Sequence, residues 1–238
     1  AVRKDMEEGP EKPGSYLGKV CALVYERYQK GRLPLALVSM DNCSHNGDKL
    51  KASVLAFAES WTKAGKAEAG FLDYVNDASS LSFPWSMIDK ITPLPHPAVE
   101  KQLLADGLEE ISPFVTAKHT YIAPFVNAEK PQYLVIEDHF PNGRPPLEHA
   151  GVIITSRDTV NKVEKMKVCT CLNPLHTCLA VYGCILGYTS IAEEMKDTEL
   201  KTFIDRMSHK EGMPFVVNPG VIDPEKFLQE VLTERFPN

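Results

Sequence analysis

The sequence predicts an α/β fold that changes, near residue 157, into a mostly α-helical fold. Two patterns indicate this class. A helix, a strand, a polar loop and a second helix follow one another early in the chain, and apolar residues keep a helical spacing through its last third. The 238 residues are enough to bury a substantial core. We therefore expect an α/β domain at residues 1–157 and a helical domain at residues 158–238.

The α/β part begins with charged residues 1–15, rich in glycine and proline, where we expect a mobile lead-in. Apolar positions predict a helix over residues 17–28, and residues 35–40 form an apolar run typical of a buried parallel strand. A polar loop at residues 41–47 leads into a helix over residues 48–63. In open α/β sheets, ligands bind at the carboxyl ends of strands, which is where this loop would lie.

The remaining elements follow the same logic. Residues 81–93 are too rich in proline for a regular helix, and short apolar runs predict strands at residues 132–137 and 152–155. Apolar positions at helical spacing predict four later helices, at residues 160–168, 174–195, 198–207 and 225–234. The last has a clear start, because Asp223 can serve as N-cap and Pro224 suits the first helical position.

Composition narrows the class of partner. The formal net charge of −6 argues against nucleic acid as the main partner, because phosphate binding needs a basic surface. The most apolar stretch, residues 177–192, is short and interrupted by Gly183 and Gly187, which favours a buried helix over a membrane span. The first residues lack the apolar stretch of a signal peptide. We expect a cytoplasmic protein whose partner is neither nucleic acid nor a membrane.

The six cysteines indicate reduced thiols, because secreted disulfide scaffolds are smaller and denser in cysteine. Cys169 and Cys171 are separated by one residue, whereas a zinc knuckle separates its cysteines by two. Cys178 and Cys184 lie in an apolar helical stretch, where cysteine commonly acts as a small hydrophobic residue. We expect no metal, and a zinc site built from these four cysteines is the alternative.

A candidate site lies where the helical part begins. Asn173 and His176 are three residues apart at a helix start, so their side chains can converge on one ligand. Lys167 nearby could accept a proton from an alcohol if burial favoured its neutral form. The amide and the imidazole would hold the oxygen that changes between alcohol and carbonyl. By spacing alone, an N-cap, a solvated lysine and a packed histidine are the stronger interpretation.

Four segments of the sequence change this preference for a structural interpretation. In chain order they are Asp41-Asn42 with Asn46-Gly47; Phe83-Pro84 with Met87 to Pro93; Val135 to Asp138 with Phe140 and Gly143-Arg144-Pro145; and Glu164, Lys167, Asn173 and His176. Together these segments resemble the mannitol dehydrogenase family of long-chain polyol and hexonate dehydrogenases, which includes fructuronate and tagaturonate reductases. The resemblance runs from about residue 35 to the end of the chain.

The resemblance implies roles for the last segment. Lys167 would be the general base in oxidation and the general acid in reduction, while Asn173 and His176 would bind and polarise the reacting oxygen. Glu164 would connect the lysine with solvent for proton exchange. The family places four residues between the lysine and the asparagine, but five lie between Lys167 and Asn173 here. We expect a loop or a bulge to absorb the extra residue.

The resemblance also implies pocket residues and a cofactor. Asn42 would contact both the nicotinamide and the substrate, and Asp89 would contact the substrate. We expect Arg144 to brace its proline-rich loop. The cofactor would be NAD, with NADP not excluded, and the α/β part would be the distal portion of a Rossmann-like dinucleotide-binding domain. No Gly-x-Gly-x-x-Gly phosphate loop occurs in the sequence, so we expect a truncated chain that is inactive by itself.

The function implied is metal-independent hydride transfer between a nicotinamide cofactor and an open-chain sugar acid, of the mannonate and fructuronate type. A polyol 2-dehydrogenase acting on mannitol or arabinitol is a close alternative. From other classes, a non-catalytic relative that acts as a binding module and a zinc-dependent dehydrogenase remain open.

Overall fold

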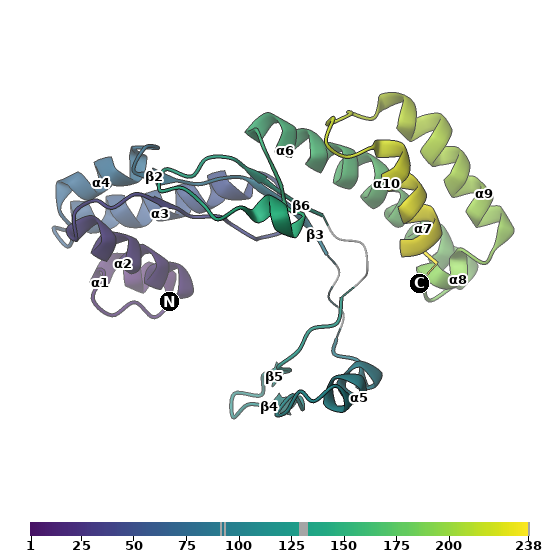
Figure 1. The fold of residues 1–238 in the computed structure, drawn as a ribbon, viewed down its shortest axis with the longest axis horizontal. Coiled ribbons are helices and arrows are strands. Elements are labelled where there is room, and N and C mark those ends of the chain that lie inside the picture. Colours follow the sequence, from purple (N-terminus) through teal and green to yellow (C-terminus); the bar gives the residue numbers. More distant parts are fainter. Residues whose placement is uncertain (91, 93, 129–132, 238) are drawn as a thin grey trace. The chain divides into compact units, whose positions relative to one another are not determined.

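The computed structural model describes residues 1–90, 92, 94–128 and 133–237 (Figure 1). Contacts within the chain define two compact units. One comprises Ala1–Met87 with Val135–Asn238, and the other comprises Ile88–Leu134. The candidate catalytic residues all belong to the first unit.

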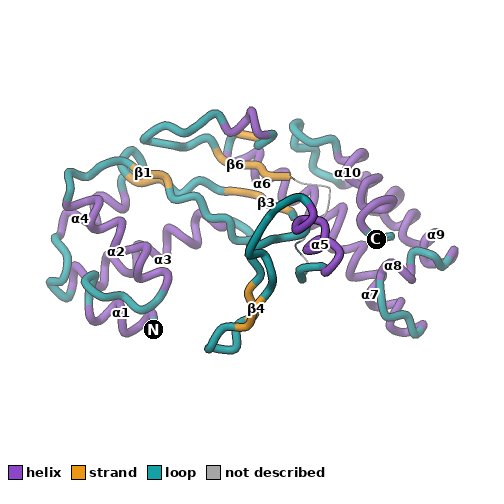
Figure 2. Tube along the Cα trace, turned by 60° about the horizontal axis from the view of Figure 1, so that its bottom comes forward, coloured by secondary structure: helices purple, strands orange, loops and turns teal. Residues whose placement is uncertain are grey.

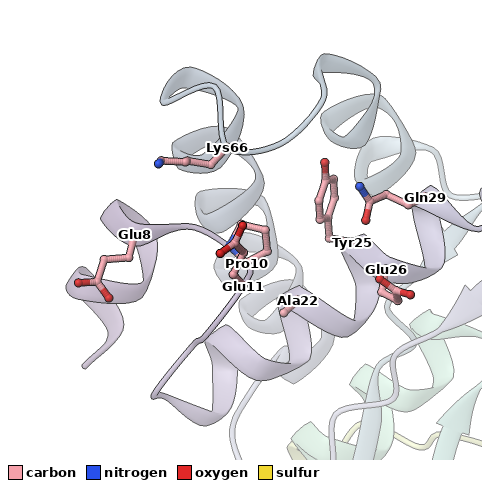
Figure 3. A pocket seen from close by; sticks show the side chains of 8 residues that line it. All are labelled: Glu8, Pro10, Glu11, Ala22, Tyr25, Glu26, Gln29 and Lys66. Carbon is pink, nitrogen blue, oxygen red and sulfur yellow. The ribbon is translucent and has the colours of Figure 1, made fainter.

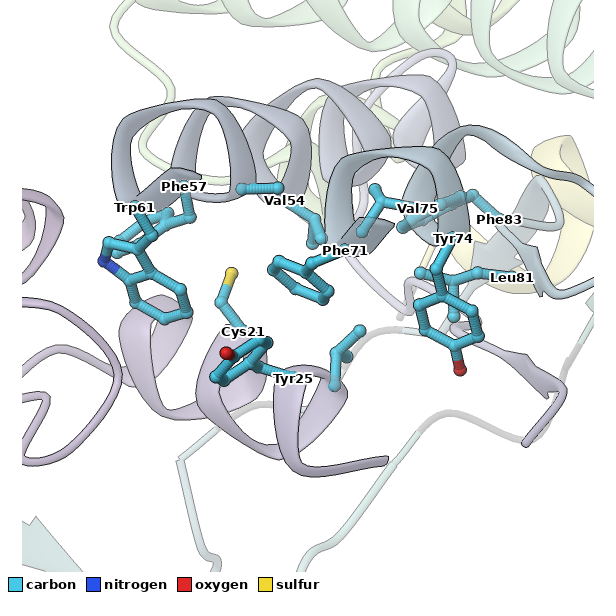
Figure 4. Close-up of a cluster of buried hydrophobic side chains, with 12 residues drawn as sticks. Cys21, Tyr25, Val54, Phe57, Trp61, Phe71, Tyr74, Val75, Leu81 and Phe83 are labelled. Atoms are coloured by element: carbon cyan, nitrogen blue, oxygen red, sulfur yellow. The ribbon is translucent and has the colours of Figure 1, made fainter. Parts of the chain in front are cut away.

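Four helices surround the N-terminal core. They are α1 (Val2–Glu8), α2 (Tyr16–Gln29), α3 (Asn46–Lys63) and α4 (Ala69–Asn76). Side chains from α2, α3 and α4 meet in one apolar cluster, in which Cys21, Trp61 and Phe71 are fully buried (Figure 4). The helices expected at residues 17–28 and 48–63 are confirmed, whereas α4 is an eight-residue helix that the sequence patterns missed.

The expectation of a mobile lead-in at residues 1–15 is wrong, because the segment folds around a buried carboxylate. Asp5 is 3 % exposed, and it accepts hydrogen bonds from the backbone N–H groups of Gly14 (2.9 Å) and Ser15 (2.7 Å) and from the Ser15 hydroxyl. These bonds lower the pKa of Asp5 to about 2. The Trp61 indole N–H donates to the Asp5 carbonyl oxygen (2.9 Å), which ties α1 to the core.

The strands are short and mostly parallel. β1 (Leu35–Ala36) pairs in parallel with β2 (Leu81–Ser82), and a three-stranded sheet has the order β3 (Ser86–Asp89), β6 (Tyr133–Glu137), β7 (Ile153–Thr155). β6 and β7 are parallel, with Val135 opposite Ile153. The expected strands are confirmed, although the first is shorter than predicted and residue 132 lies outside the described residues. This is the α/β architecture that the sequence predicts.

After β7 the described chain contains helices and loops but no strand (Figure 2). The α-helices are α6 (Arg157–Glu164), α7 (Asn173–Leu186), α8 (Ile191–Glu194), α9 (Thr198–Arg206) and α10 (Pro224–Glu230), and π-helical segments follow α6, α9 and α10. A single helix over residues 174–195 was expected and is wrong, because Gly187 ends α7 with a left-handed φ of 90°. Asp223 caps α10 through Glu225 N–H (3.0 Å), as predicted.

The second unit was not anticipated from the sequence. It contains α5 (Pro97–Ala105) and an antiparallel hairpin of β4 (Phe114–Val115) and β5 (Tyr121–Ile122). Two-residue strands and a nine-residue helix are too short to produce a readable periodicity.

Candidate active site

The loop after β1 is fixed by Asn46, which is 2 % exposed. Its side-chain amide donates to the carbonyl oxygens of Ser39 (3.2 Å), Asp41 (3.0 Å) and Ser86 (3.0 Å), and its Oδ1 accepts from Ser86 N–H (3.0 Å). One side chain therefore joins the loop to the first residue of β3. The sequence indicated Asn46 only as part of a motif. Its hydrogen bonds to Ser86, 40 residues later, could not be predicted from that motif.

The next residue, Gly47, must be a glycine for a steric reason. A Cβ atom there would overlap the backbone carbonyl oxygen of Phe83, so a side chain would push α3 away from the strand segment. Asn42, on the same loop, is exposed. Asp89 is the last residue of β3, and its side chain lies outside the described part of the structure, as do Ile91 and Pro93 of the same motif.

The loop also contacts the first helix of the helical part. The hydroxyl of Ser44 donates a hydrogen bond to Oε1 of Glu164, which is the last residue of α6. Next to it, Nε2 of His45 lies 3.4 Å from Oδ1 of Asn161. The structure thus brings together the segment that contains Asn42 and the helix that contains Glu164.

An aromatic and ionic cluster reinforces this junction. The His45 ring stacks on Trp85, with centroids 4.1 Å apart, and the Trp85 indole N–H donates to Asp48 (2.9 Å). The guanidinium carbon of Arg157 lies 5.0 Å from the Trp85 ring centroid. Residues from the loop, from the segment before β3 and from α6 therefore meet around one indole.

Glu137, at the end of β6, anchors the same cluster from the sheet. Its carboxylate accepts from Nε of Arg157 (2.9 and 3.0 Å) and from the backbone N–H of Trp85 (3.0 Å). Its side chain is only 12 % exposed, which strengthens a charge-assisted hydrogen bond relative to one in water. Glu137 belongs to a matched motif, but the spacing of that motif contained no signal for its partner 20 residues away.

The segment that contains the extra residue before Asn173 is a π-helix. Residues Lys165–Leu172 are π-helical, and α6, this segment and α7 follow one another without a loop. The Asn173 N–H donates to the carbonyl oxygen of Val168, five residues earlier rather than four. Each π turn holds one more residue than an α turn, and such insertions are frequent at functional sites. The expected bulge is therefore a helical one.

The three residues that the sequence predicts at the reacting carbon have different surroundings. Lys167 is completely buried, with Nζ 4.7 Å from the centroid of the Phe227 ring in α10. Asn173 and His176 are exposed one turn apart on α7, and the His176 ring lies 6.1 Å from that of Phe236. Asn173 lines an open, mostly apolar groove of about 590 Å³, and neither Lys167 nor His176 is among the residues that line it.

A buried carboxylate beside α7 was missed by the sequence patterns. Glu194 of α8 is 2 % exposed, and within the described chain its Oε2 has no hydrogen-bond partner. A Cβ atom on Gly183 would overlap Oε1, so the glycine leaves room for this carboxyl group. Burial raises the pKa of Glu194, and the charge of His176 acts in the opposite direction.

Arg144 braces its loop, as predicted. It donates to Asp138 (Nε to Oδ1, 2.9 Å) and to Glu148 (Nη1 to Oε2, 2.8 Å), and it lowers the pKa of Glu148. These partners belong to the same stretch of chain, so the guanidinium group stiffens the turn itself.

A polar pocket of about 490 Å³ lies apart from these residues, between α1, α2 and the turn after α3 (Figure 3). It is lined by Glu8, Glu11, Glu26 and Lys66, and it contains none of the candidate residues.

Among the described residues, no group of three histidine, cysteine or acidic side chains could hold a metal ion. The six cysteines are free thiols, and burial raises the pKa of Cys21 to about 12.

The architecture is that of a Rossmann-type α/β domain followed by a helical C-terminal domain. The mannitol dehydrogenase Rossmann domain matches residues 5–149, and the mannitol dehydrogenase C-terminal domain matches residues 159–238. The chain therefore belongs to the mannitol dehydrogenase family.

Individual relatives agree with this assignment. A D-mannonate oxidoreductase of Thermotoga maritima is 54% identical over the whole chain, and a polyol:NADP oxidoreductase of Gluconobacter oxydans is 30% identical over the whole chain. Among solved structures, Pseudomonas fluorescens mannitol 2-dehydrogenase in complex with NAD and D-mannitol superimposes with a TM-score of 0.73 at 29% identity, covering 100% of this chain and 43% of that one. The chain spans 44% of the length of each of the two relatives named first.

Proposed function

We propose that this chain is part of a metal-independent oxidoreductase that transfers a hydride between a nicotinamide cofactor and an open-chain sugar acid of the mannonate and fructuronate type. The observation that carries the proposal is the 54% identity to a D-mannonate oxidoreductase along the entire chain. The activity is proposed for an enzyme of the length of its relatives that contains these residues.

Within that enzyme, residues 1–157 would form the distal part of the dinucleotide-binding domain and residues 158–238 part of the catalytic domain. The two family matches end at residue 149 and begin at residue 159, on either side of this boundary, which supports the division. Ser156, which caps α6 through the N–H of Thr159, supports it as well, because the helical part starts there.

NAD is the proposed cofactor, and it supplies the hydride acceptor in oxidation and the hydride donor in reduction. The residues present fit its nicotinamide end, because the loop of residues 41–47 follows parallel strand β1 and leaves Asn42 exposed. The sequence has no glycine-rich phosphate loop, so other residues of the enzyme would hold the pyrophosphate. NADP is the alternative, supported by the Gluconobacter relative.

The chain's own residues would handle the proton and the reacting oxygen. Lys167 would accept the hydroxyl proton at Nζ, and its complete burial supports this role because burial favours a neutral amine. The Asn173 amide and the His176 imidazole would donate hydrogen bonds to the oxygen that becomes a carbonyl. Glu164, one turn before the lysine, would exchange the proton with solvent, while Asn42 and Asp89 would contact the substrate.

We also propose a cytoplasmic enzyme. By length and composition alone, the helical run Arg157–Leu186 could cross a membrane, although core helices of soluble proteins share that property. Lys167 and Glu164 lie within this run, Lys167 packs against α10, and the π-helical segment interrupts the α-helix. Only 22% of the most apolar window of this run is buried within the described chain, so the expectation of a buried helix over residues 177–192 is wrong. The two charged residues and the π-helical interruption nevertheless support a helix of a soluble protein.

A substrate panel tests the proposal. The enzyme is assayed with NAD and NADP on D-mannonate, D-mannitol and D-arabinitol, before and after exhaustive chelation. We expect the highest kcat/KM with D-mannonate and no loss on chelation. A preference for a polyol would favour the alternative that the 30% identity to the polyol oxidoreductase supports.

Substitution of Lys167 separates a catalyst from a non-catalytic relative. Lys167→Ala should lower kcat by about a hundredfold or more, while the matched control Lys165→Ala, at an exposed position two residues earlier, should leave it unchanged. Equal activity of the two variants would contradict the proposed role of Lys167, and absence of turnover by the parent enzyme would indicate a binding module.

A further inference from the structure

The contact between the loop of residues 41–47 and α6 joins two parts of the candidate site. Ser44 and Glu164 are 120 positions apart in sequence, and the Ser44 hydroxyl donates to Oε1 of the Glu164 carboxylate. Ser44 has no part in the roles proposed so far. Its hydroxyl is nevertheless bonded directly to the carboxylate that would exchange protons for Lys167.

The loop that presents Ser44 is held firmly. Asn46 fastens it to Ser86, and His45 adopts a left-handed backbone conformation (φ 55°) with its ring stacked on Trp85. A hydroxyl on such a loop has a defined position, whereas a glutamate on a helix surface samples several rotamers when nothing holds it. The hydrogen bond therefore orders the carboxylate more than the serine.

The helix that bears Glu164 is held from the other side. Arg157, in the first turn of α6, is paired with Glu137 at the end of β6, and Asn161 approaches His45. Glu164 is the last residue of α6, and Lys167 follows three residues later, in the π-helical segment. Residues three apart along a helix lie about one turn from each other.

We propose that Ser44 is a positioning residue for Glu164, and that its hydroxyl fixes the carboxylate in the orientation that relays protons between Lys167 and solvent. The proposal rests on the proposed function above. In oxidation, the substrate hydroxyl proton moves to the Lys167 amine, then from that ammonium group to Oε2 of Glu164, and then to water. Ser44 keeps its own proton throughout, and by bonding Oε1 it leaves Oε2 to receive the travelling one. Reduction runs the same path in reverse.

The test compares variants of the enzyme with its parent, using D-mannonate and NAD. Ser44→Ala removes the hydroxyl, and Ser44→Thr keeps it. Ser53→Ala is the matched control, because Ser53 is a half-buried serine on α3 whose hydroxyl donates to the carbonyl oxygen of Lys49, in its own helix (2.9 Å). The measurements are kcat, KM, the solvent deuterium isotope effect on kcat and the melting temperature.

We expect Ser44→Ala to lower kcat about tenfold with little change in KM, and to raise the solvent isotope effect because proton relay becomes rate-limiting. Ser44→Thr should recover most of the rate, and Ser53→Ala should resemble the parent. Glu164→Gln combined with Ser44→Ala should be no slower than Glu164→Gln alone, because both changes interrupt one relay.

Two results would overturn the inference while leaving the proposed function intact. One is an unchanged kcat in Ser44→Ala when Glu164→Gln is slow, and the other is a loss in KM and melting temperature with no change in the isotope effect. A parent enzyme that does not oxidise D-mannonate, D-mannitol or D-arabinitol would instead overturn the proposed function, and this inference with it.

Discussion

Lys167 and Phe227 connect the π-helical segment to α10, because Nζ of the lysine lies 4.7 Å from the centroid of the phenylalanine ring. Both side chains are almost completely buried, at 0% and 1% exposure. The ring covers the amino group and excludes water from it, and once the lysine has accepted a proton the ring's negative face stabilises the ammonium group. The ring therefore takes part in fixing Lys167, a residue of the candidate site that lies inside the protein.

Replacing Phe227 tests this contact. Phe227→Leu should lower the free energy of unfolding of the chain by about 1 to 3 kcal/mol, because it removes both buried ring volume and the interaction with Lys167. Chemical denaturation followed by circular dichroism measures the change. Phe215→Leu is the control, since Phe215 is 83% exposed. Equal stability of the two variants would show that Phe227 contributes no more than a surface ring.

The buried carboxyl group of Glu194 predicts a pH dependence. Its pKa in the folded chain lies above the ordinary value of 4.5, so folding is favoured when the group is protonated and opposed once it ionises. The destabilisation is absent below about pH 4.5 and grows as the pH rises through the raised pKa. Glu194→Gln should therefore match the parent near pH 4 and be more stable at pH 7 to 8.

Denaturation curves from pH 4 to pH 8 measure the difference between Glu194→Gln and the parent. Glu193→Gln is the matched control on the same helix, because Glu193 is exposed and should show no such trend. A difference between Glu194→Gln and the parent that stays constant with pH would mean that the pKa of this carboxyl group is the same in the folded and unfolded chain, which would contradict the prediction.

Asp5 predicts the opposite trend. Its pKa is lowered to about 2 by hydrogen bonds from Ser15 and Gly14, so the stability it contributes is present above about pH 4 and is lost as the pH falls toward 2. Asp5→Asn should be less stable than the parent at pH 7, and the gap should close at low pH. Glu7→Gln, at an exposed position on the same helix, serves as control. A gap of equal size at pH 7 and pH 2 would contradict the assignment.

The π-helical segment predicts tolerance of a deletion. Removing exposed Cys169 should turn the π turn into an α turn and change the free energy of unfolding by about 1 kcal/mol or less, because the flanking helices keep their direction. Removing Val181, which is similarly exposed within the regular helix α7, should rotate the residues after it by about 100° and misplace Gly183 against Glu194. Thermal melts of both deletions decide the matter, and equal destabilisation would argue against a π insertion.

Local patterns in the sequence were sufficient for part of this description. The apolar spacing of α2 and α3 and the Asp223-Pro224 start of α10 predict those helices, because the interactions that define them lie within a few residues. The spacing of Asn173 and His176 likewise places both on one helix face. The four motifs, in their order along the chain, indicated the mannitol dehydrogenase family, and the matches to its two domains confirm that family.

Tertiary structure decided the rest, and the reason is the same in each case. Asp5 turns a glycine- and proline-rich lead-in into a folded segment because the backbone N–H groups it accepts from lie nine and ten residues away. Ser44 meets Glu164 across 120 residues, and Lys167 becomes buried only when α10 packs over it. The free energy of a polar group depends on whether folding gives it a partner or removes its water. Residue type and local spacing determined which side chains this protein has for its chemistry, while contacts between distant segments decided which of them are held, buried or left exposed.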